Sequence, residues 1–266
     1  PHKMLTGRKQ AYMDPALYDS VSPYTDPAET PHDLFKIGHT STSISLALGL
    51  AKARDIMGGK ENIIAVIGDG SMSGGEALEG LNVAGELNSN FIIVFNDNQM
   101  SIAENHGGMY DQFAELRRTN GAAENNLFKS MGLDYLYVND GNDIEALIAA
   151  FEQVKDSTHP VVVHINTLKG KGYAPAEANK EKWHWHMPFD IQTGQSPASG
   201  SSESYASIFA EYALKRAKTD PKFLVLMSAV PALLGLTQER REELGKHYLD
   251  VGIAEETAVA MASGAA

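Results

Sequence analysis

Three short apolar runs, each ending in glycine or polar residues, constrain the fold of this chain most strongly. They are "NIIAVIGDG" (62–70), "FIIVFNDN" (91–98) and "PVVVHINTLKG" (160–170). Continuous runs of this length are typical of strands buried on both faces of a parallel sheet. Helical patterns lie before and between them, at residues 38–59, 75–88 and 143–156. Because parallel strands need crossover helices, the sequence predicts an α/β fold, with a parallel sheet covered by helices on both faces.

The composition along the chain also predicts a domain boundary. Residues 1–36 are polar and rich in Pro, Asp and Tyr, which is typical of loop with short helices. Residues 193–204 ("TGQSPASGSSES") have the composition of a linker, and a new alternation of helices and strands follows it. We therefore predict a first domain at 1–192, incomplete at its N-terminus, and the beginning of a second, incomplete α/β domain at 205–266.

The composition excludes several classes of function. The net charge of −12 leaves no surplus of basic residues for binding nucleic acid. The chain has no cysteine, which excludes disulfides and thiolate chemistry and agrees with a cytoplasmic location. No apolar run is long enough to span a membrane. No signal-peptide pattern opens the chain, which starts within a polar segment and is compatible with a missing upstream portion.

The glycine-rich turn "VIGDGSMSGG" (66–75) holds an acid between its first two glycines. The dinucleotide pattern G-x-G-x-x-G fails because Ser73 takes the place of the last glycine, and the P-loop pattern fails because Glu76 takes the place of the lysine. Either loop would place Asp69 against phosphate without compensation. A divalent cation between Asp69 and a pyrophosphate removes this conflict, and Mg²⁺ commonly bridges protein oxygens to phosphates.

A second ligand for such a cation is expected at the end of the neighbouring strand. Asn98 lies there, and the main-chain carbonyl of Met100 follows it. The carboxyl ends of parallel strands form the edge at which open α/β sheets bind ligands. Each motif taken alone also fits a structural turn, a glycine turn at Asp69 and an Asx turn at Asn98. Together the two motifs predict a site for Mg²⁺ and a diphosphate.

The residues around this pair resemble those of a known family. "GDG" (68–70) followed further along by "NDN" (96–98) is similar to the thiamine diphosphate motif. Further segments resemble the 1-deoxy-D-xylulose-5-phosphate synthase family: "PHKMLTGRK" (1–9), "GHTSTSISLALGLAKARD" (38–55), "NDNQMSIAEN" (96–105), "KGKGYAPAE" (169–177) and "DVGIAEETAVAMASG" (250–264). Transketolases share the metal motif but not the NDN-x-MSI or KGKGY-x-PAE forms. The resemblance runs the length of the chain, which is compact between "HGGMY" (106–110) and "NNLFKSMGLDY" (125–135), where many family members carry a long insertion.

The resemblance implies a pyrophosphate-binding domain, a pyrimidine-binding domain and a C-terminal domain, of which this chain would hold most of the first and the start of the second. It implies a transferase that condenses pyruvate with glyceraldehyde 3-phosphate, with loss of CO₂, in isoprenoid, thiamine and pyridoxal biosynthesis. The implied cofactors are thiamine diphosphate and Mg²⁺, and the implied assembly is a homodimer. The arginines that bind the phosphate of the aldehyde, and an upstream histidine segment, are expected outside this chain.

The resemblance also implies which residues hold the cofactor. Asp69, Asn98 and the Met100 carbonyl match the Mg²⁺ ligands of the family. The other implied cofactor contacts are Gly38, His39, Thr40, Gly70, Ser71 and Tyr173. Gly70 and Ser71 are expected to bring backbone N–H groups close to the diphosphate. The nearby Lys169 and Lys171 are expected to be surface charges, and His164 a residue of the core.

Two residues match catalytic positions of the family. Glu255 matches the glutamate that protonates the aminopyrimidine ring, and we expect it at a buried junction where desolvation raises its pKa. Glu255 and its neighbour Glu256 also fit a structural role as first-turn acids of a helix. Thr257 stands where the family usually has histidine, which leaves the contribution of that position open. His184 matches an active-site histidine, whereas His186 is expected to be structural.

Two alternative functions stay open. One is another thiamine diphosphate-dependent transferase, such as a transketolase, which would accept ketose donors in place of pyruvate. The other is a cofactor-binding module without catalysis, because the second domain is expected to be incomplete. The helix with small residues at 258–266 ("AVAMASGAA") is expected to pack closely against another helix in a homodimer.

Overall fold

The computed structural model describes residues 2–196 and 203–266. It divides into two compact units, residues 1–40 and residues 41–266, which are described separately. The linker predicted at 193–204 falls partly on residues 197–202, which lie outside the described residues. In the part of the chain that the structure describes, no helix has the length and apolar character needed to cross a membrane.

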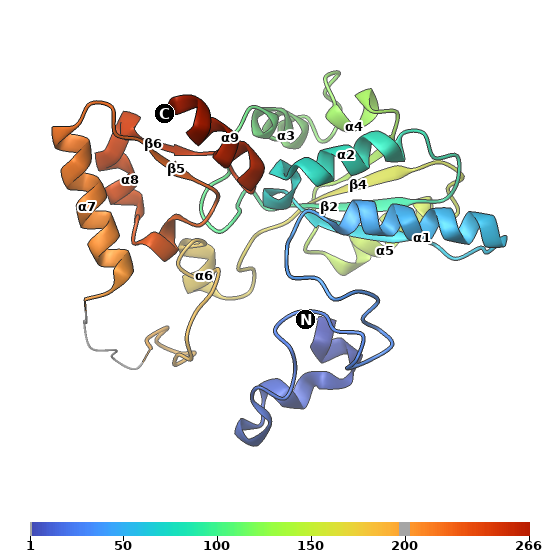
Figure 1. Cartoon of the computed structure of the whole chain (residues 1–266). Helices are drawn as coiled ribbons and strands as arrows, with labels where there is room; N and C mark the ends of the chain where they lie inside the picture. The colour runs from blue at the N-terminus through green and yellow to red at the C-terminus, as the bar shows by residue number, and fades with distance from the viewer. Residues whose placement is uncertain (1, 197–202) are drawn as a thin grey trace. The chain divides into compact units, whose positions relative to one another are not determined.

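A four-stranded parallel sheet forms the centre of the larger unit (Figure 1). The strand order is β1-β2-β4-β3, and the strands are β1 (Ile64–Gly68), β2 (Ile92–Asp97), β3 (Asp134–Val138) and β4 (Val161–Asn166). The predicted parallel α/β architecture is confirmed, with each of the three apolar runs forming a strand. β3 was not predicted; it is an edge strand whose residues are mostly only partly buried.

Helices cover both faces of this sheet. Successive residues of a strand point to opposite sides, so each strand contributes side chains to the core on either face. Ile93 and Phe95 of β2 pack in a core with one set of helices, and Ile92 and Val94 pack with α5. The first set is α1 (Ser43–Met57), α2 (Gly75–Ala84), α3 (Met109–Arg118) and α4 (Leu127–Ser130), and α5 spans Ile144–Val154 (Figure 1). The helix predicted at 38–59 finishes on the pair Gly58-Gly59, and α1 ends at Met57, directly before Gly58, which is left-handed with a φ of 70°.

A two-stranded parallel sheet follows in the C-terminal part of the larger unit. Its core is separate from those of the main sheet and includes Ala210, Met227 and Leu236. The elements from β4 onward are α6 (Ala174–Ala178), α7 (Tyr205–Thr219), β5 (Val225–Met227), α8 (Gln238–Leu244), β6 (Tyr248–Asp250) and α9 (Glu255–Ala265). Short helical turns lie at Gly70–Ser73, Pro231–Leu234 and Gly245–His247. The helices and strands expected in 205–266 are therefore present in the predicted order.

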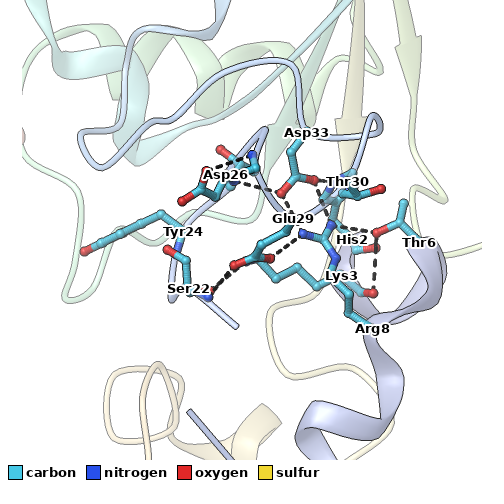
Figure 2. A network of polar contacts seen from close by, with 12 residues as sticks. His2, Lys3, Thr6, Arg8, Ser22, Tyr24, Asp26, Glu29, Thr30 and Asp33 are labelled. Carbon is cyan, nitrogen blue, oxygen red and sulfur yellow. Dashed lines mark hydrogen bonds and ion pairs between the residues drawn. The ribbon is translucent and has the colours of Figure 1, made fainter. Parts of the chain in front are cut away.

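The smaller unit contains short helical turns joined by loops, as its polar composition predicts. The turns are η1 (Met4–Arg8), η2 (Lys9–Tyr12) and η3 (Pro15–Leu17). Figure 2 shows the polar network that holds η1 to the loop of residues 22–33. Arg8 donates to both carboxylate oxygens of Asp33 at 2.7 Å, and His2 contacts the same carboxylate at 2.7 Å. Lys3 pairs with Glu29 at 2.6 Å.

Asp33 is the acid at the centre of this network. Its side chain is fully buried. The hydrogen bond from Arg8 outweighs burial and, with the contributions of Asp26 N–H and His2, holds the pKa of Asp33 well below its usual range. A buried carboxylate with this many donors stays ionised and stabilises the folded unit only while it is ionised.

Replacing Asp33 with asparagine is expected to loosen residues 2–40 at neutral pH and to reduce their sensitivity to acid, leaving the part that comes from Asp26 and Glu29. Because folding lowers the pKa of Asp33, its contribution is complete above the unfolded pKa of about 3.9 and is lost as the pH falls toward the folded value. Hydrogen exchange measured by mass spectrometry at neutral and acidic pH would follow both effects. Asp19→Asn, at an exposed aspartate, is the matched control. Parent-like protection of Asp33→Asn at neutral pH would contradict the prediction.

Candidate functional site

The candidate site lies at the carboxyl ends of β1 and β2. These strands are adjacent and parallel, with Gly68 opposite Asn96. The backbone N–H of Asp69 continues the ladder by donating to Asn96 O at 3.1 Å. The glycine turn after β1 and the NDN turn after β2 therefore leave the sheet side by side, at the edge where ligands bind in open α/β sheets.

The carboxylate of Asp69 lies where these two turns meet. Asp69 is 2% exposed. Its carboxylate accepts a hydrogen bond from Asn105 Nδ2 at 2.7 Å, and the backbone N–H groups of Gly70 and Asn98 lie near enough to lower its pKa. The turns that carry Asp69 and Asn98, far apart in the sequence, are thus neighbours in the fold. Asn105 did not emerge from the sequence analysis, although it lies within the quoted segment "NDNQMSIAEN".

The electrostatics of Asp69 favour a cation beside it. Burial and the charge of the neighbouring Asp97 raise the pKa of Asp69 to about 6, against the three N–H donors that lower it. Among the described residues, none forms a salt bridge with Asp69. Also within the described part of the chain, no three His, Asp or Glu side chains gather into a metal site. A hard divalent cation, bound by carboxylate, amide and carbonyl oxygens, fits this acid.

The NDN turn supplies the other oxygens of the predicted ligand set. Asn98 Oδ1 accepts a hydrogen bond from Met100 N at 3.2 Å, so the Asx turn considered as an alternative is present. An amide oxygen has two lone pairs, and this contact therefore leaves one for a cation. Gln99, between these residues, is left-handed with a φ of 67°. The chain folds back on itself through a bridge between Met100 and Glu104.

The glycine turn packs against the segment that follows the NDN turn. A Cβ atom on Gly70 would lie 2.8 Å from Ser101 Cβ and 2.9 Å from Ser101 Cα, so only glycine fits without displacement. The close approach expected at Gly70 is therefore made by Ser101. Ser71 O accepts a hydrogen bond from Ser41 Oγ at 2.7 Å, which ties the turn to the start of α1.

A buried polar network lies beneath the NDN turn. Asp97 pairs with Arg117 and accepts a hydrogen bond from His164 Nε2 at 3.0 Å. The other ring nitrogen of His164 accepts from Tyr135 Oη at 2.7 Å. Although burial opposes it, the contacts with His164 and Arg117 lower the pKa of Asp97, while burial lowers the pKa of His164. His164 is a core residue, as expected, and it also fixes the acid next to Asn98.

The loop before α9 packs directly on the glycine turn. Ser73 Oγ accepts from Ile253 N at 2.8 Å and donates to Gly70 O at 2.8 Å. A Cβ on Gly252, whose φ is 79°, would lie 2.8 Å from Ser73 Oγ. Glu255 follows as the first residue of α9. The glycine turn and the loop before α9 therefore contact each other within one chain.

The expectation that Glu255 lies at a buried junction is wrong for the described residues, in which Glu255 is exposed. The physical reason is that α9 has no buried residue, because the C-terminal sheet has only two described strands. Val259 and Met261 of the same helix are 69% and 40% exposed. This helix has no buried residue in the part of the chain that the structure describes.

Lys169 is not the surface charge expected from the sequence. It is half-buried, and its Nζ donates to Ser101 O. Burial lowers the pKa of Lys169, while the charge of Asp69 acts in the opposite direction. His184 is exposed, but desolvation of its imidazole by nearby protein and the charge of Lys169 lower its pKa, which favours the neutral form. Lys169 thus places a positive charge near both Asp69 and His184.

An aromatic cluster orients the segment that carries His184. The ring of Tyr173 packs edge-on against Trp183, with centroids 5.1 Å apart, and the ring of His186 stacks on Trp183 at 4.3 Å. The structural role expected for His186 agrees with this stacking. The hydroxyl of Tyr173 is buried without a hydrogen-bond partner among the described residues.

The remaining predicted contacts belong to the smaller unit. Gly38, His39 and Thr40 are exposed in that unit, and His39 Nδ1 lies 2.7 Å from Thr40 O. Helix α1 begins three residues after Thr40, at Ser43. The position of these three residues relative to Asp69 stays a prediction.

A polar cavity of about 700 Å³ borders the NDN turn on the side of β3 and β4. Gln99 belongs to its lining, together with Asn139, Asp140, Asn142, Asn166, Thr167 and Lys171. The cavity is rich in amide groups, and it lies at the carboxyl ends of the strands, as does Asp69. This edge of the sheet therefore offers both a buried acid and space for polar groups of a ligand.

Comparison with known proteins identifies the family. The family model for 1-deoxy-D-xylulose-5-phosphate synthase matches residues 1–125 and 118–167. The two matches meet within the stretch that the sequence analysis marks as compact, between α3 and α4. Asp69, Asn98, Asn105 and His164 all lie in the matched residues.

Curated relatives match the whole chain. 1-Deoxy-D-xylulose-5-phosphate synthase 1 of Geobacter sulfurreducens is 38% identical over 304 residues, covering all of this chain and 47% of its own length. The synthases of Pelotomaculum thermopropionicum and Desulforudis audaxviator are 36% and 38% identical, with 47% of each covered. The chain spans about half the length of these relatives. The chain belongs to the 1-deoxy-D-xylulose-5-phosphate synthase family.

Proposed function

We propose that the intact protein condenses pyruvate with glyceraldehyde 3-phosphate, with loss of CO₂, to form 1-deoxy-D-xylulose 5-phosphate. The observation that carries the proposal is that Asp69 and Asn98 directly follow adjacent, paired parallel strands, in a chain of this family. Thiamine diphosphate and Mg²⁺ are the proposed cofactors. When bound, thiamine diphosphate supplies an electron sink for breaking the bond to the carboxyl carbon of pyruvate.

The residues of the chain fit these cofactors. We assign Asp69, Asn98 and the Met100 carbonyl to Mg²⁺, because all three offer oxygen ligands and Asp69 is a buried acid without a cationic partner among the described residues. The N–H groups of Gly70 and Ser71 would face the diphosphate. Gly38, His39, Thr40 and Tyr173 are the other proposed contacts, with the orphaned Tyr173 hydroxyl in support.

Two side chains would handle protons. Glu255 would hold a proton against the aminopyrimidine ring, and the loop before it is fixed to the glycine turn through Ile253. His184 would accept and return protons at the substrate, a role that its lowered pKa supports because the neutral imidazole is the base. Lys169 would add positive charge near the bound anions.

We also propose a cytoplasmic homodimer. The lack of cysteine in the sequence supports a reducing compartment. The uncovered helix α9, with exposed Val259 and Met261, supports additional protein over this part of the chain, either from a second copy or from the same polypeptide. A monomer in light scattering of the intact protein would contradict the homodimer.

The test of the function is an assay of the intact protein with pyruvate, glyceraldehyde 3-phosphate, thiamine diphosphate and Mg²⁺. Release of CO₂ and formation of deoxyxylulose phosphate are expected. Turnover of ketose donors without pyruvate would favour a transketolase instead. Cofactor binding without any turnover would favour a binding module.

A further inference from the structure

Asn105 lies against the proposed metal ligand without a role in the function described so far. Its Nδ2 donates to Asp69 Oδ2 at 2.7 Å. Its Oδ1 is buried and, among the described residues, has no hydrogen-bond partner. A buried amide oxygen without a donor costs free energy, and such an atom in a native site points to a partner that binds there.

The segment around Asn105 is held from several sides. The bridge between Met100 and Glu104 folds it back toward the NDN turn, and Lys169 Nζ binds Ser101 O within the fold. Arg241 of α8 donates to Glu104 Oε2 at 2.8 Å, directly next to Asn105. Because the residues just before Asn105 are anchored, and Nδ2 itself binds Asp69, the amide group of Asn105 is held against Asp69.

The chemistry of the orphaned oxygen identifies its partner. Oδ1 can only accept, so a diphosphate oxygen, which is itself an acceptor, cannot be its partner, whereas the cation or a water bound to it can. Mg²⁺ in proteins usually keeps several water ligands, and each of these waters is a donor. We propose that Asn105 is a positioning residue of the metal site, whose Nδ2 orients Asp69 and whose Oδ1 accepts a hydrogen bond from a water bound to the cation.

This inference rests on the proposed function, because it assumes Mg²⁺ at Asp69. Groups that orient metal ligands typically contribute 10–100-fold to metal affinity. Replacing Asn105 with leucine, which has a similar size, or with alanine removes both the donor and the acceptor. Either variant is expected to raise the Kd for Mg²⁺ by about 10–100-fold.

The experiment is a titration of the intact protein with Mg²⁺ at saturating thiamine diphosphate, followed by tryptophan fluorescence or calorimetry. Asn88→Ala is the matched control, since Asn88 is exposed and lies away from the turn after β1. Thermal unfolding without Mg²⁺ is measured in parallel. A merely structural asparagine would change the unfolding temperature of the metal-free protein and leave the Mg²⁺ affinity of the folded protein unchanged.

The outcomes separate the inference from the function on which it rests. Weaker Mg²⁺ binding in both Asn105 variants, with Asn88→Ala like the parent, supports the positioning role. Parent-like Mg²⁺ affinity in folded Asn105→Leu and Asn105→Ala overturns it and leaves the proposed function standing. A parent protein that binds thiamine diphosphate equally well with and without Mg²⁺ contradicts the metal site itself.

Discussion

Replacing Glu255 with alanine is expected to lower kcat of the intact protein for deoxyxylulose phosphate formation by about 10²–10⁴-fold, the usual contribution of a general acid or base. The proposed role of this carboxyl group is to hold a proton at the cofactor ring. Glu256 is one residue further along α9 and points elsewhere on the helix, because successive helical residues are about 100° apart. Release of CO₂ from pyruvate measures the effect directly.

Glu256→Ala is the matched control for this prediction. Both acids are exposed and both lie in the first turn of α9, so a role in the helix dipole alone would give the two variants similar, small effects. Glu255→Gln tests the proton separately, since the amide keeps the size of the side chain and loses its acid. Turnover of Glu255→Ala within a few-fold of the parent would refute the assignment.

Replacing Asp69 with asparagine is expected to weaken Mg²⁺-dependent binding of thiamine diphosphate. The loss should exceed the roughly 10–100-fold seen when a group that only orients a metal ligand is removed. The substitution removes the one formal charge that the chain is proposed to offer the cation. It also removes a buried carboxylate whose pKa is raised to about 6 by burial and by Asp97. Folding therefore opposes ionisation of Asp69 at neutral pH, and the metal-free variant is expected to be at least as stable as the parent.

These opposite effects make the test specific. Thermal unfolding would be measured with and without Mg²⁺ and thiamine diphosphate, and the cofactors are expected to stabilise only the parent. Asp111→Asn, at an exposed aspartate of α3, is the control and should behave as the parent in both conditions. Loss of stability in metal-free Asp69→Asn, with cofactor binding intact, would show that Asp69 has a structural role instead.

The sheet was predictable from the sequence to the extent that its strands are buried. β1, β2 and β4 are continuous apolar runs, because helices cover both faces of the sheet. β3 escaped prediction since it lies at the edge, where Asp134 and two tyrosines replace the apolar run. The stop at Gly58 was predictable from local chemistry, whereas the exposure of α9 depends on how much protein covers it.

The candidate site was predictable only where a residue directly follows a strand. Asp69 and Asn98 meet this condition, since sheet register alone brings the ends of β1 and β2 together. Asn105 and Lys169 do not, because their positions depend on how the segment after Met100 folds back. A sequence shows that such residues are polar, but not which acid they contact.

The hydroxyl of Ser73 has a consequence for the geometry of the whole site. One oxygen atom holds both the carbonyl of Gly70, next to the proposed metal ligand, and the amide of Ile253, two residues before the proposed acid. A single side chain therefore links the loop beside the proposed metal ligand to the loop before the proposed acid, at the two ends of the proposed cofactor site. A shift of either loop would be transmitted to the other through this hydroxyl. The two loops would therefore move together, and the distance between the metal and the acid would be kept.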